Sequence, residues 1–383
     1  MDETRIMTIG EVCATISDTY RAKADEVTLI NTSDVLEGKV LNHERVPNKE
    51  LKGQFKKTFK KNDILYSEIR PQNKRFAFVD FDPVDYIAST KLMVLRADSS
   101  KVLPMYLYFY LKSAPVVAEL QMLAETRSGT FPQITFTELS NLTIPVPSIT
   151  EQQAIVTTIK CIEDKIDCNT EINDNLYDLL QSVYQLQFGV TSGNAAEGTL
   201  SDICSYTKDR IAVSELNLGN YYSTENMLPG KAGFTEATSL PTTSQTTRCN
   251  AGDVLVSNIR PYFKKIVLCH SEGGCSTDVL CFAPKAPAYS AYLFCTLYAD
   301  RFFDFMVAGS KGTKMPRGDK QQIMTFPVYI PTESELTAFA DFATPILSQI
   351  HGNNEENARL EHLRDTLLPK LMSGEIDVSA IDI

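Results

Sequence analysis

The 383-residue chain lacks the excess of positive charge that marks a protein which coats nucleic acid. It carries 37 Lys and Arg against 48 Asp and Glu, a formal net charge of −11. Any binding to a polyanion therefore needs a local basic patch. Hydrophobic residues make up 43% and charged residues 22%, which is typical of globular chains and argues against wholesale disorder or a coiled-coil rod. The length predicts two or three domains.

Long apolar runs and paired cysteines are also missing. No apolar run approaches the roughly 20 residues of a membrane span, and residues 1–5 lack the basic-then-apolar pattern of a secretory signal. None of the nine cysteines forms a Cys-x-x-Cys pair, so neither a zinc knuckle nor a thioredoxin-like motif is spelled out. We expect a soluble, cytoplasmic protein whose thiols mostly lie in its core.

Signatures of catalysis are absent as well. The sequence has no Gly-x-x-x-x-Gly-Lys-Ser/Thr, no Gly-x-Gly-x-x-Gly, no Gly-x-Ser-x-Gly and no His-Glu-x-x-His. It also lacks the Asn-Pro-Pro-Tyr/Phe loop of amino-methyltransferases, and no Asp…Glu-x-Lys nuclease set is apparent. These absences predict a binding protein that is not an enzyme, with no catalytic residues and no cofactor or metal site of its own.

What the sequence does have is an internal duplication. Residues 62–71, NDILYSEIRP, return as residues 252–261, GDVLVSNIRP, with six of ten positions identical. The offset of 190 drops to 184 at Pro132 and Pro316, and it then holds at 184 through the rest of each half. Each half therefore has a variable front and a rigid back, which indicates one duplication rather than a solenoid.

The rigid backs are predicted to be long helices. Apolar residues recur mostly at steps of three and four over residues 151–188 and 333–372, the spacing of a coiled-coil seam. Polar interruptions at residues 168–170 and 352–354 fall at nearly the same place in both and suit register control. We expect the two helices to pair with each other as an antiparallel coiled coil; ordinary domain helices are the alternative.

Local signals mark the ends of both helices. Ser148 and Thr332 can act as N-caps, and residues 332–335, Thr-Glu-Ser-Glu, have the spacing of a capping box. Gly189 and Gly374 are expected to close the helices. Two prolines are misfits in the second helix: Pro345 is expected to mark an initial turn or a kink, and Pro369 to end or bend the helix near Lys370.

The variable fronts predict mixed α+β domains that are pseudo-symmetric with each other. Short apolar strands are followed by a helical stretch in each half. The predicted strands are residues 63–66, 76–79 and 88–95 in the first half and 253–256, 266–269 and 277–282 in the second; the helical stretches are 104–113 and 290–306. The predicted division of the chain is a first domain over 1–147, a helix over 148–190, a second domain over 191–331, and a helix with a tail over 332–383.

Positive charge is concentrated at matched places in both halves. It precedes and follows the Arg-Pro strand, and it surrounds a Gly-Thr…Pro element further on. Such clusters suit phosphate contacts, and neighbouring polar side chains suit base reading in a groove. An ordinary solvated face is the alternative. The candidate DNA-binding residues are Lys56, Lys57, Lys60, Lys61, Ser67, Arg70, Lys74, Arg75, Arg127, Thr130, Ser257, Asn258, Arg260, Lys264, Lys265, Lys311, Thr313, Lys314 and Arg317.

Taken together and in order, these motifs resemble the specificity (S) subunits of type I restriction–modification systems. The resemblance covers essentially the whole chain. Its carriers are the Asp-x-Leu-x-Ser-x-Ile-Arg-Pro strand and the Gly-Thr…Pro element in each half, IPVPSITEQQAI at residues 144–155, and LRDTLLPKLMSGEI at residues 363–376. Residues 330–335, IPTESE, depart from the usual Pro-Glu-Gln of the family.

The resemblance implies two target recognition domains, 1–147 and 191–331, each recognising one half of a bipartite double-stranded DNA sequence. It implies that the long helices act as a spacer and dock two methyltransferase (modification) subunits, with restriction subunits joining through the complex. S-adenosylmethionine would belong to the methyltransferase partners, and the chain itself would catalyse nothing.

Two other classes of protein stay open at this point. An adaptor that uses its coiled coil to hold partners would show no salt-dependent retention on DNA. A nuclease or methyltransferase with an unrecognised site would show metal- or cofactor-dependent activity as the purified chain. The duplicated Arg-Pro and Gly-Thr patterns argue against the first, and the missing motifs argue against the second.

Overall fold

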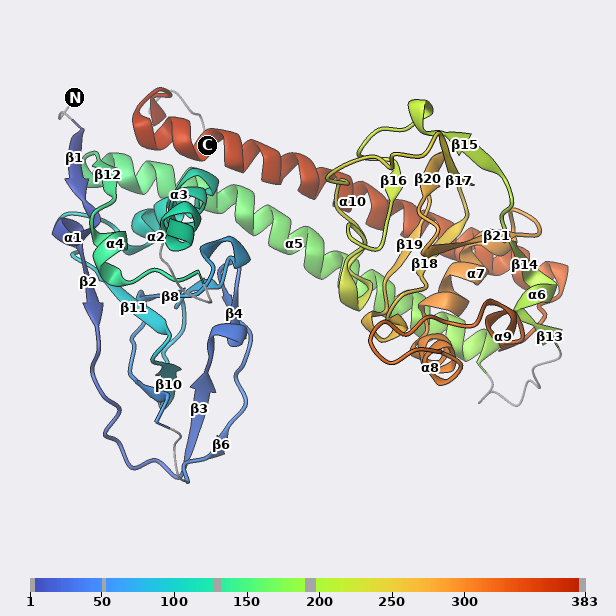
Figure 1. Ribbon diagram of the computed structural model, residues 1–383, viewed down its shortest axis with the longest axis horizontal. Helices are drawn as coiled ribbons and strands as arrows, with labels where there is room; N and C mark the ends of the chain where they lie inside the picture. The colour runs from blue at the N-terminus through green and yellow to red at the C-terminus, as the bar shows by residue number, and fades with distance from the viewer. Residues whose placement is uncertain (1–3, 50–52, 127–131, 190–197, 379–383) are drawn as a thin grey trace. The chain divides into compact units, whose positions relative to one another are not determined.

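A computed structural model describes residues 4–49, 53–126, 132–189 and 198–378. The chain divides into two compact units. Unit 1 comprises Met1–Asp167 with Asn357–Ile383, and unit 2 comprises Cys168–Glu356. Each unit contains a part of both long helices, α5 (Ile149–Phe188) and α10 (Glu333–Ser373) (Figure 1). The division at residues 147, 190 and 331 follows sequence motifs and stays a prediction.

Unit 1 is built on two four-stranded sheets, with strand orders β2-β11-β8-β9 and β6-β3-β10-β7. Helices α2 and α3 share a core with the first sheet. The strands are β1 (Arg5–Thr8), β2 (Cys13–Ile16), β3 (Glu26–Ile30), β4 (Val35–Leu36), β5 (Lys39–Val40), β6 (Val46–Pro47), β7 (Phe55–Lys57), β8 (Ile64–Ser67), β9 (Phe76–Phe78), β10 (Tyr86–Ser89), β11 (Leu92–Ala97) and β12 (Thr143–Val146). The helices before α5 are α1 (Ile9–Val12), α2 (Pro104–Lys112), α3 (Ala114–Thr126) and α4 (Phe136–Ser140).

Unit 2 repeats this plan. Its first sheet has the order β14-β21-β18-β19, and each strand occupies the place of its counterpart in unit 1. The strands are β13 (Gly198–Thr199), β14 (Cys204–Tyr206), β15 (Arg210–Ala212), β16 (Tyr221–Tyr222), β17 (Gln245–Cys249), β18 (Val254–Ser257), β19 (Ile266–Leu268), β20 (Gly273–Cys275), β21 (Val279–Pro284) and β22 (Pro327–Val328). The helices before α10 are α6 (Leu200–Ile203), α7 (Tyr289–Tyr298), α8 (Asp300–Ala308) and α9 (Lys320–Met324).

The second sheets show where the two copies diverge. Three strands correspond, β3-β10-β7 in unit 1 and β16-β20-β17 in unit 2, and the β3–β10 and β16–β20 pairs are both parallel. The fourth strand lies on opposite edges, since β6 pairs with β3 but β15 pairs with β17. The predicted fold class, α+β with two related halves and two long helices, is confirmed, and the variable part of each half is this second sheet.

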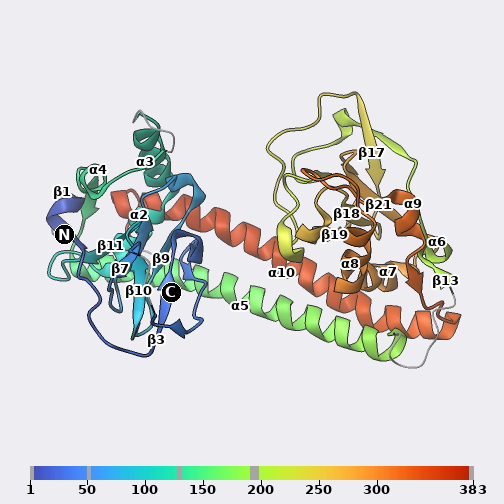
Figure 2. The same cartoon turned by 60° about the horizontal axis from the view of Figure 1, so that its bottom comes forward.

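The helices α5 and α10 pack side by side within each unit (Figures 1 and 2). In unit 1, Ile155 and Ile159 share a core with Leu368 and Leu371. In unit 2, the ring centroids of Phe188 and Phe339 lie 5.3 Å apart, while Asn173, earlier in α5, donates to the carbonyl of Ile350, later in α10. Residues later in α5 contact residues earlier in α10, so the two helices are antiparallel. Among the described residues no helix is apolar enough over sufficient length to cross a membrane.

A buried layer of amides interrupts the apolar seam in unit 2. Asn173 is bonded to Asn353 and Asn354, with N···O distances of 2.8 and 2.9 Å, and Asn169 donates to Glu356 at 2.8 Å. Asn169, Asn173 and Asn353 are each at least 94% buried. A one-residue slip would leave these groups unpaired at a cost of about 1–3 kcal/mol each. The layer thus fixes the register that the polar interruptions predicted.

The helix ends match the sequence signals with one exception. The backbone amides of Ser148 and Thr332 donate to the carboxylates of the third following residues, at 3.0 and 2.8 Å, and Gly374 closes α10 with φ +76°. However, α10 continues through Pro345 and Pro369 to Ser373. Pro369 was expected to end or bend the helix; the end is contradicted, because packing of the last turn in the core of unit 1 outweighs the lost hydrogen bond, and the bend stays a prediction.

The duplicated aspartates before β8 and β18 are both buried but differ in their partners. Asp63 accepts two bonds from Arg96, each 2.7 Å long, which raises the pKa of that guanidinium. Among the described residues Asp253 has no arginine partner; it accepts from the Asn250 amide at 2.8 Å, and burial raises the pKa of its carboxyl. The aspartate therefore stabilises unit 1 through an ion pair. In unit 2 the equivalent carboxyl is buried without a positively charged partner and is destabilising.

We predict that Asp63→Asn lowers the free energy of unfolding of unit 1 by about 2 kcal/mol, because it leaves Arg96 without its carboxylate. Asp253→Asn is the matched control and should change the stability of unit 2 by less than about 0.5 kcal/mol at neutral pH, since an amide keeps the Asn250 bond without a buried charge. Urea unfolding, with hydrogen exchange in β8 and β18 to assign the units, measures both. Equal losses would contradict this account.

Candidate nucleic-acid interface

The Ser-x-Ile-Arg-Pro segment forms the same tight loop after β8 and after β18. The Ser67 hydroxyl donates to the carbonyl of Ile69 at 3.4 Å, and the Ser257 hydroxyl donates to the carbonyl of Ile259 at 3.1 Å. Both serines are 97% buried. They hold the loop by bonding its backbone, as side-chain hydroxyls do in turns, so their position in the interface is structural.

Each loop continues into a 3₁₀ helix, Pro71–Asn73 or Pro261–Phe263, that is bounded by basic residues with left-handed backbone. The φ angles of the first basic residue in the two units are +46° and +50°, and those of the second are +52° and +51°. A left-handed backbone at a residue other than glycine costs on the order of 1 kcal/mol. It is kept only where contacts with surrounding segments stabilise that conformation. The residues concerned are Arg70 and Lys74 in unit 1 and Arg260 and Lys264 in unit 2.

The segments that follow the Gly-Thr elements make the contacts that fix these loops. In unit 1 the Arg70 amide donates to the Pro132 carbonyl at 3.1 Å, and the Ile134 amide donates to the Glu68 carbonyl at 2.8 Å. In unit 2 the Arg260 amide donates to Pro316 at 2.8 Å, and the Gly318 amide donates to Asn258 at 3.2 Å. Two motifs about sixty residues apart thus form one backbone-paired site in each unit, which we call the paired loops.

The predicted residues of the first Gly-Thr element, Arg127 and Thr130, lie outside the described residues. In unit 2 the corresponding segment is described, and Thr313 is exposed at the tip of the loop. A backbone bridge between Lys311 and Arg317 closes this loop, with N···O distances of 2.9 Å in both directions.

Several of the predicted basic residues lie on the surface of their unit. Lys56, Lys60, Lys61 and Lys314 are exposed. Others are ion-paired at the surface; Lys74, Lys311 and Arg317 are exposed and Lys264 is half-buried. The pairs are Lys74–Glu37 at 2.9 Å, Lys264–Asp300 at 2.9 Å, Lys311–Asp319 at 2.6 Å and Arg317–Asp278 at 3.2 Å.

Three of the predicted basic residues instead bind carbonyl groups of the protein itself. Lys57 donates to Thr90 and Leu92 at 3.1 and 2.8 Å, and burial lowers the pKa of its ammonium. Lys265 donates to Thr224 at 2.6 Å, and burial lowers its pKa too. Arg75 donates to the carbonyls of Ser33 and Val35. The sequence placed these residues in basic clusters, but it did not show that their side chains stabilise loops of the protein by binding backbone carbonyls.

Two buried polar atoms near the unit 2 loop have no hydrogen-bond partner among the described residues. They are Oδ1 of Asn258 and Nε of Arg260. A buried polar atom without a hydrogen-bond partner lowers the free energy of unfolding by about 1–3 kcal/mol, and native proteins contain few such atoms. Their position in the paired loops of unit 2 agrees with a surface that is completed by a ligand.

Sequence reasoning missed four polar residues that border the paired loops. Glu68 and Lys91 form an ion pair at 3.3 Å, Lys91 also donates to Gln133 at 3.5 Å, and Asp278 holds Arg317. Gln133 could have been found, because it faces Arg317 at the constant offset of 184. Lys91 and Asp278 gave no signal, because only strand pairing brings them to the loops.

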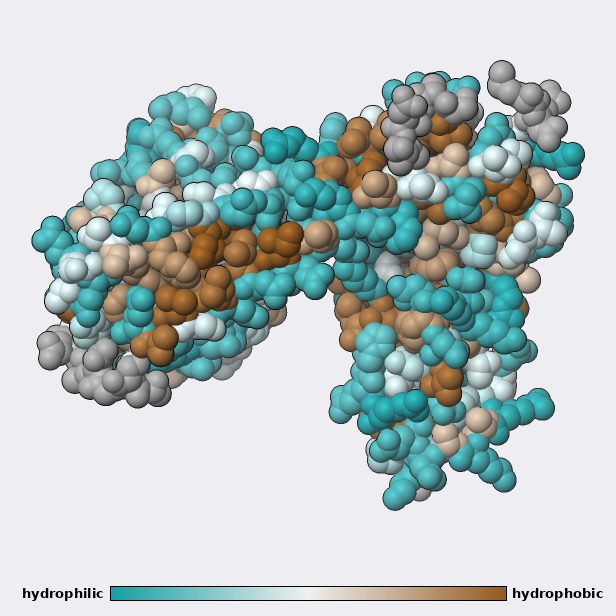
Figure 3. Space-filling model, turned by 180° about the vertical axis from the view of Figure 1, so that it is seen from behind, coloured by the Kyte–Doolittle hydropathy of each residue, from teal (hydrophilic) through white to brown (hydrophobic). Residues whose placement is uncertain are grey.

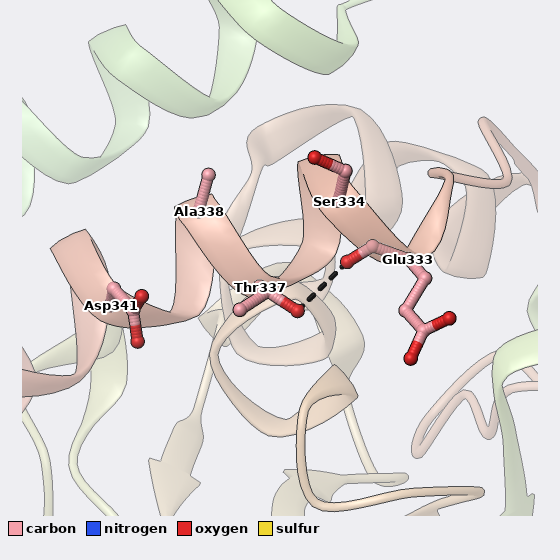
Figure 4. Close-up of a pocket in the computed structure, with 5 residues that line it drawn as sticks. All are labelled: Glu333, Ser334, Thr337, Ala338 and Asp341. Carbon is pink, nitrogen blue, oxygen red and sulfur yellow. Dashed lines mark hydrogen bonds between the residues drawn. The ribbon is translucent and has the colours of Figure 1, made fainter.

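A shallow pocket lies elsewhere, along the first turns of α10 (Figure 4). Its lining residues are Glu333, Ser334, Thr337, Ala338 and Asp341, and the Thr337 hydroxyl donates to the Glu333 carbonyl at 2.8 Å. Two carboxylates and no basic group make it unsuited to phosphate. The paired loops therefore remain the candidate interface.

Comparison with known proteins shows which proteins this chain is similar to. Residues 1–177 match the family described as "Type I restriction modification DNA specificity domain". The specificity subunit of the type I restriction enzyme HindI of Haemophilus influenzae is 42% identical over 189 residues, which cover 49% of this chain and 41% of that protein. The EcoDI specificity subunit of Escherichia coli is 25% identical over 132 residues, which cover 33% of this chain and 29% of that protein.

A solved structure shares the fold of the whole chain. The S subunit of a type I restriction–modification system from M. genitalium aligns with a TM-score of 0.56 and 18% identity over 97% of this chain and 96% of its own. Residues 1–177 are thus similar to the type I DNA specificity domain, and the resemblance to type I specificity subunits that the sequence motifs predicted is confirmed as a resemblance. The matched segments span less than half the length of the curated relatives.

Two neighbouring lysines test which basic residues face the nucleic acid. We predict that Lys56→Ala leaves stability within about 0.5 kcal/mol and lowers the slope of log K against log salt by about 0.9. Lys57→Ala should leave that slope unchanged and cost about 1–2 kcal/mol of stability, because two carbonyls lose their donor. DNA titrations of the assembled complex at several salt concentrations, with urea unfolding, separate the two. A reduced slope for Lys57→Ala would contradict the assignment.

Proposed function

We propose that this chain is the non-catalytic specificity subunit of a type I restriction–modification complex and that each unit recognises one half of a bipartite double-stranded DNA target. One observation carries the proposal. The Arg-Pro loop and the Gly-Thr…Pro segment are paired by equivalent backbone hydrogen bonds in both units, with the same left-handed residues and basic side chains around them. Two such sites on one chain suit two half-sites on one duplex.

The evidence for the second half of the target comes from the fold. The family match ends at residue 177, but unit 2 repeats the first sheet strand for strand and retains the loop after β18. The second sheets differ in their edge strands, and the side chains around the loops differ. Related frames with different surfaces support two half-sites with different sequences.

The long helices are the proposed spacer and docking surface. In unit 2 they leave Leu179, Leu186 and Phe342 exposed, and Figure 3 shows a hydrophobic patch on the face of this unit that carries α5 and α10. Exposed apolar patches of this kind mark protein interaction sites. We assign this face to the methyltransferase subunits, two per specificity subunit, through which restriction subunits join. S-adenosylmethionine belongs to those methyltransferase subunits.

The proposal predicts that Arg70→Ala and Arg260→Ala act on different half-sites. Each variant of the assembled complex should bind the full target about tenfold more weakly, a change of about 1.4 kcal/mol, because a positively charged loop residue is lost. Binding to duplexes in which one half-site is randomised measures the effect for each unit, and each variant is the control for the other. If both variants keep the affinity of the original chain, these arginines only shape their loops.

A second prediction concerns the spacer. Insertion of one heptad into both α5 and α10, next to the amide layer of Asn173 and Asn353, adds about 10 Å to the paired helices while it keeps their facing residues. The gap between the two half-sites should grow by about three base pairs, at 3.4 Å each, with both half-sites unchanged. Selection from a random duplex library measures this. A changed half-site with an unchanged gap would contradict the spacer role. Insertion into α5 alone is the control and should lower stability, since it breaks the register.

A further inference from the structure

Three polar positions border the paired loops in each unit, and the two units fill all three differently. The first position follows the loop serine, the second precedes the neighbouring strand, and the third lies in the segment after the Gly-Thr element. Strand register proves the equivalence, since Leu92 pairs with Ser67 as Val279 pairs with Ser257. We call the two sets the polar triads: Glu68, Lys91 and Gln133 in unit 1, and Asn258, Asp278 and Arg317 in unit 2.

The backbone that holds the triads is the same in both units. The Glu68 amide donates to the Lys91 carbonyl at 3.0 Å, and the Asn258 amide donates to the Asp278 carbonyl at 2.8 Å. The third residue is fixed by an isolated bridge in each case, to Ile69 in unit 1 and to Ile259 in unit 2. The three side chains of each triad therefore extend from equivalent backbone positions. The two triads differ in the chemical nature of their side chains and not in the backbone that carries them.

In unit 1 the triad presents an amide beside an ion pair. Lys91 lies 3.3 Å from a carboxylate oxygen of Glu68 and donates at 3.5 Å to the side-chain oxygen of Gln133. Gln133 is exposed. The contact from Lys91 engages its oxygen and thereby orients the amide.

In unit 2 the triad presents a guanidinium held on one edge. Nε and Nη2 of Arg317 lie 3.3 and 3.2 Å from the same carboxylate oxygen of Asp278, and 53% of the Arg317 side chain is exposed. This contact occupies the Nε side of the fork, so the Nη1–Nη2 edge remains for a second planar acceptor pair. The buried Asn258 behind it packs against Gly318, where any side chain would collide with its Oδ1.

We propose that Gln133 and Arg317 are equivalent base-reading positions, with Gln133 selecting an adenine in one half-site and Arg317 selecting a guanine in the other. The amide of glutamine matches N6 and N7 of adenine, and the guanidinium edge matches O6 and N7 of guanine. Lys91 and Asp278 are positioning residues that aim these side chains. This inference rests on the proposed function and names the residues that give the two half-sites different sequences.

The test exchanges the two residues in the full chain assembled with its modification subunits, and it selects duplexes from a random library. Gln133→Arg should change one position of one half-site from A·T to G·C, and Arg317→Gln should change one position of the other half-site from G·C to A·T. We expect each preference to shift by at least roughly tenfold. If both variants select the sequence of the original chain, the inference is overturned; equal loss of affinity for all sequences overturns it too.

Two conservative variants keep the test decisive if an exchange disturbs folding. Arg317→Lys keeps the charge but not the planar fork, so discrimination for guanine should fall severalfold while the salt slope stays the same. Asp278→Asn should lower that discrimination without changing affinity for random-sequence DNA, an effect that loss of packing alone would not produce. A folded Arg317→Lys complex with undiminished preference for guanine overturns the inference. If the original complex selects no bipartite sequence at all, the proposed function itself has failed.

Discussion

The structure depends on the backbone pairing between the Arg-Pro loop and the segment that follows the Gly-Thr element. In each unit two amide-to-carbonyl bonds join segments that are about sixty residues apart, and one of them fixes an arginine in a left-handed conformation that this residue type otherwise avoids. Because the bonds involve only main-chain atoms, the side chains at the edge of the loops are free to differ. A fixed frame with exchangeable side chains is what recognition of variable sequences requires.

The second constraint is the pairing of α5 with α10. Apolar contacts give the two helices their attraction, but contacts of this kind tolerate slippage. The amides of Asn169, Asn173 and Asn353 do not, since each is buried and bonded to the partner helix. Each unit thus contains the paired loops, and in unit 2 buried amides fix the register of the two helices.

Sequence reasoning predicted the large features and missed the local ones. The repeat, the helix caps and the strands β8 and β18 were visible because they depend on periodicity and on short motifs. The roles of Lys57 and Lys265 were not, because the carbonyls they bind belong to segments more than thirty residues away. The sequence also did not show that α10 continues beyond Pro369, since tertiary packing decides whether a helix continues through a proline. Lys91 and Asp278 reached the site only through strand register.

The most direct test of the central claim is a map of methylated adenines in genomic DNA from cells with and without this chain, with its modification subunit present in both. The account predicts that deletion removes methylation from one bipartite sequence, with two short specified parts separated by a fixed gap, and from no other. An unchanged methylation map would contradict the specificity role and leave a coiled-coil adaptor as the reading of the fold.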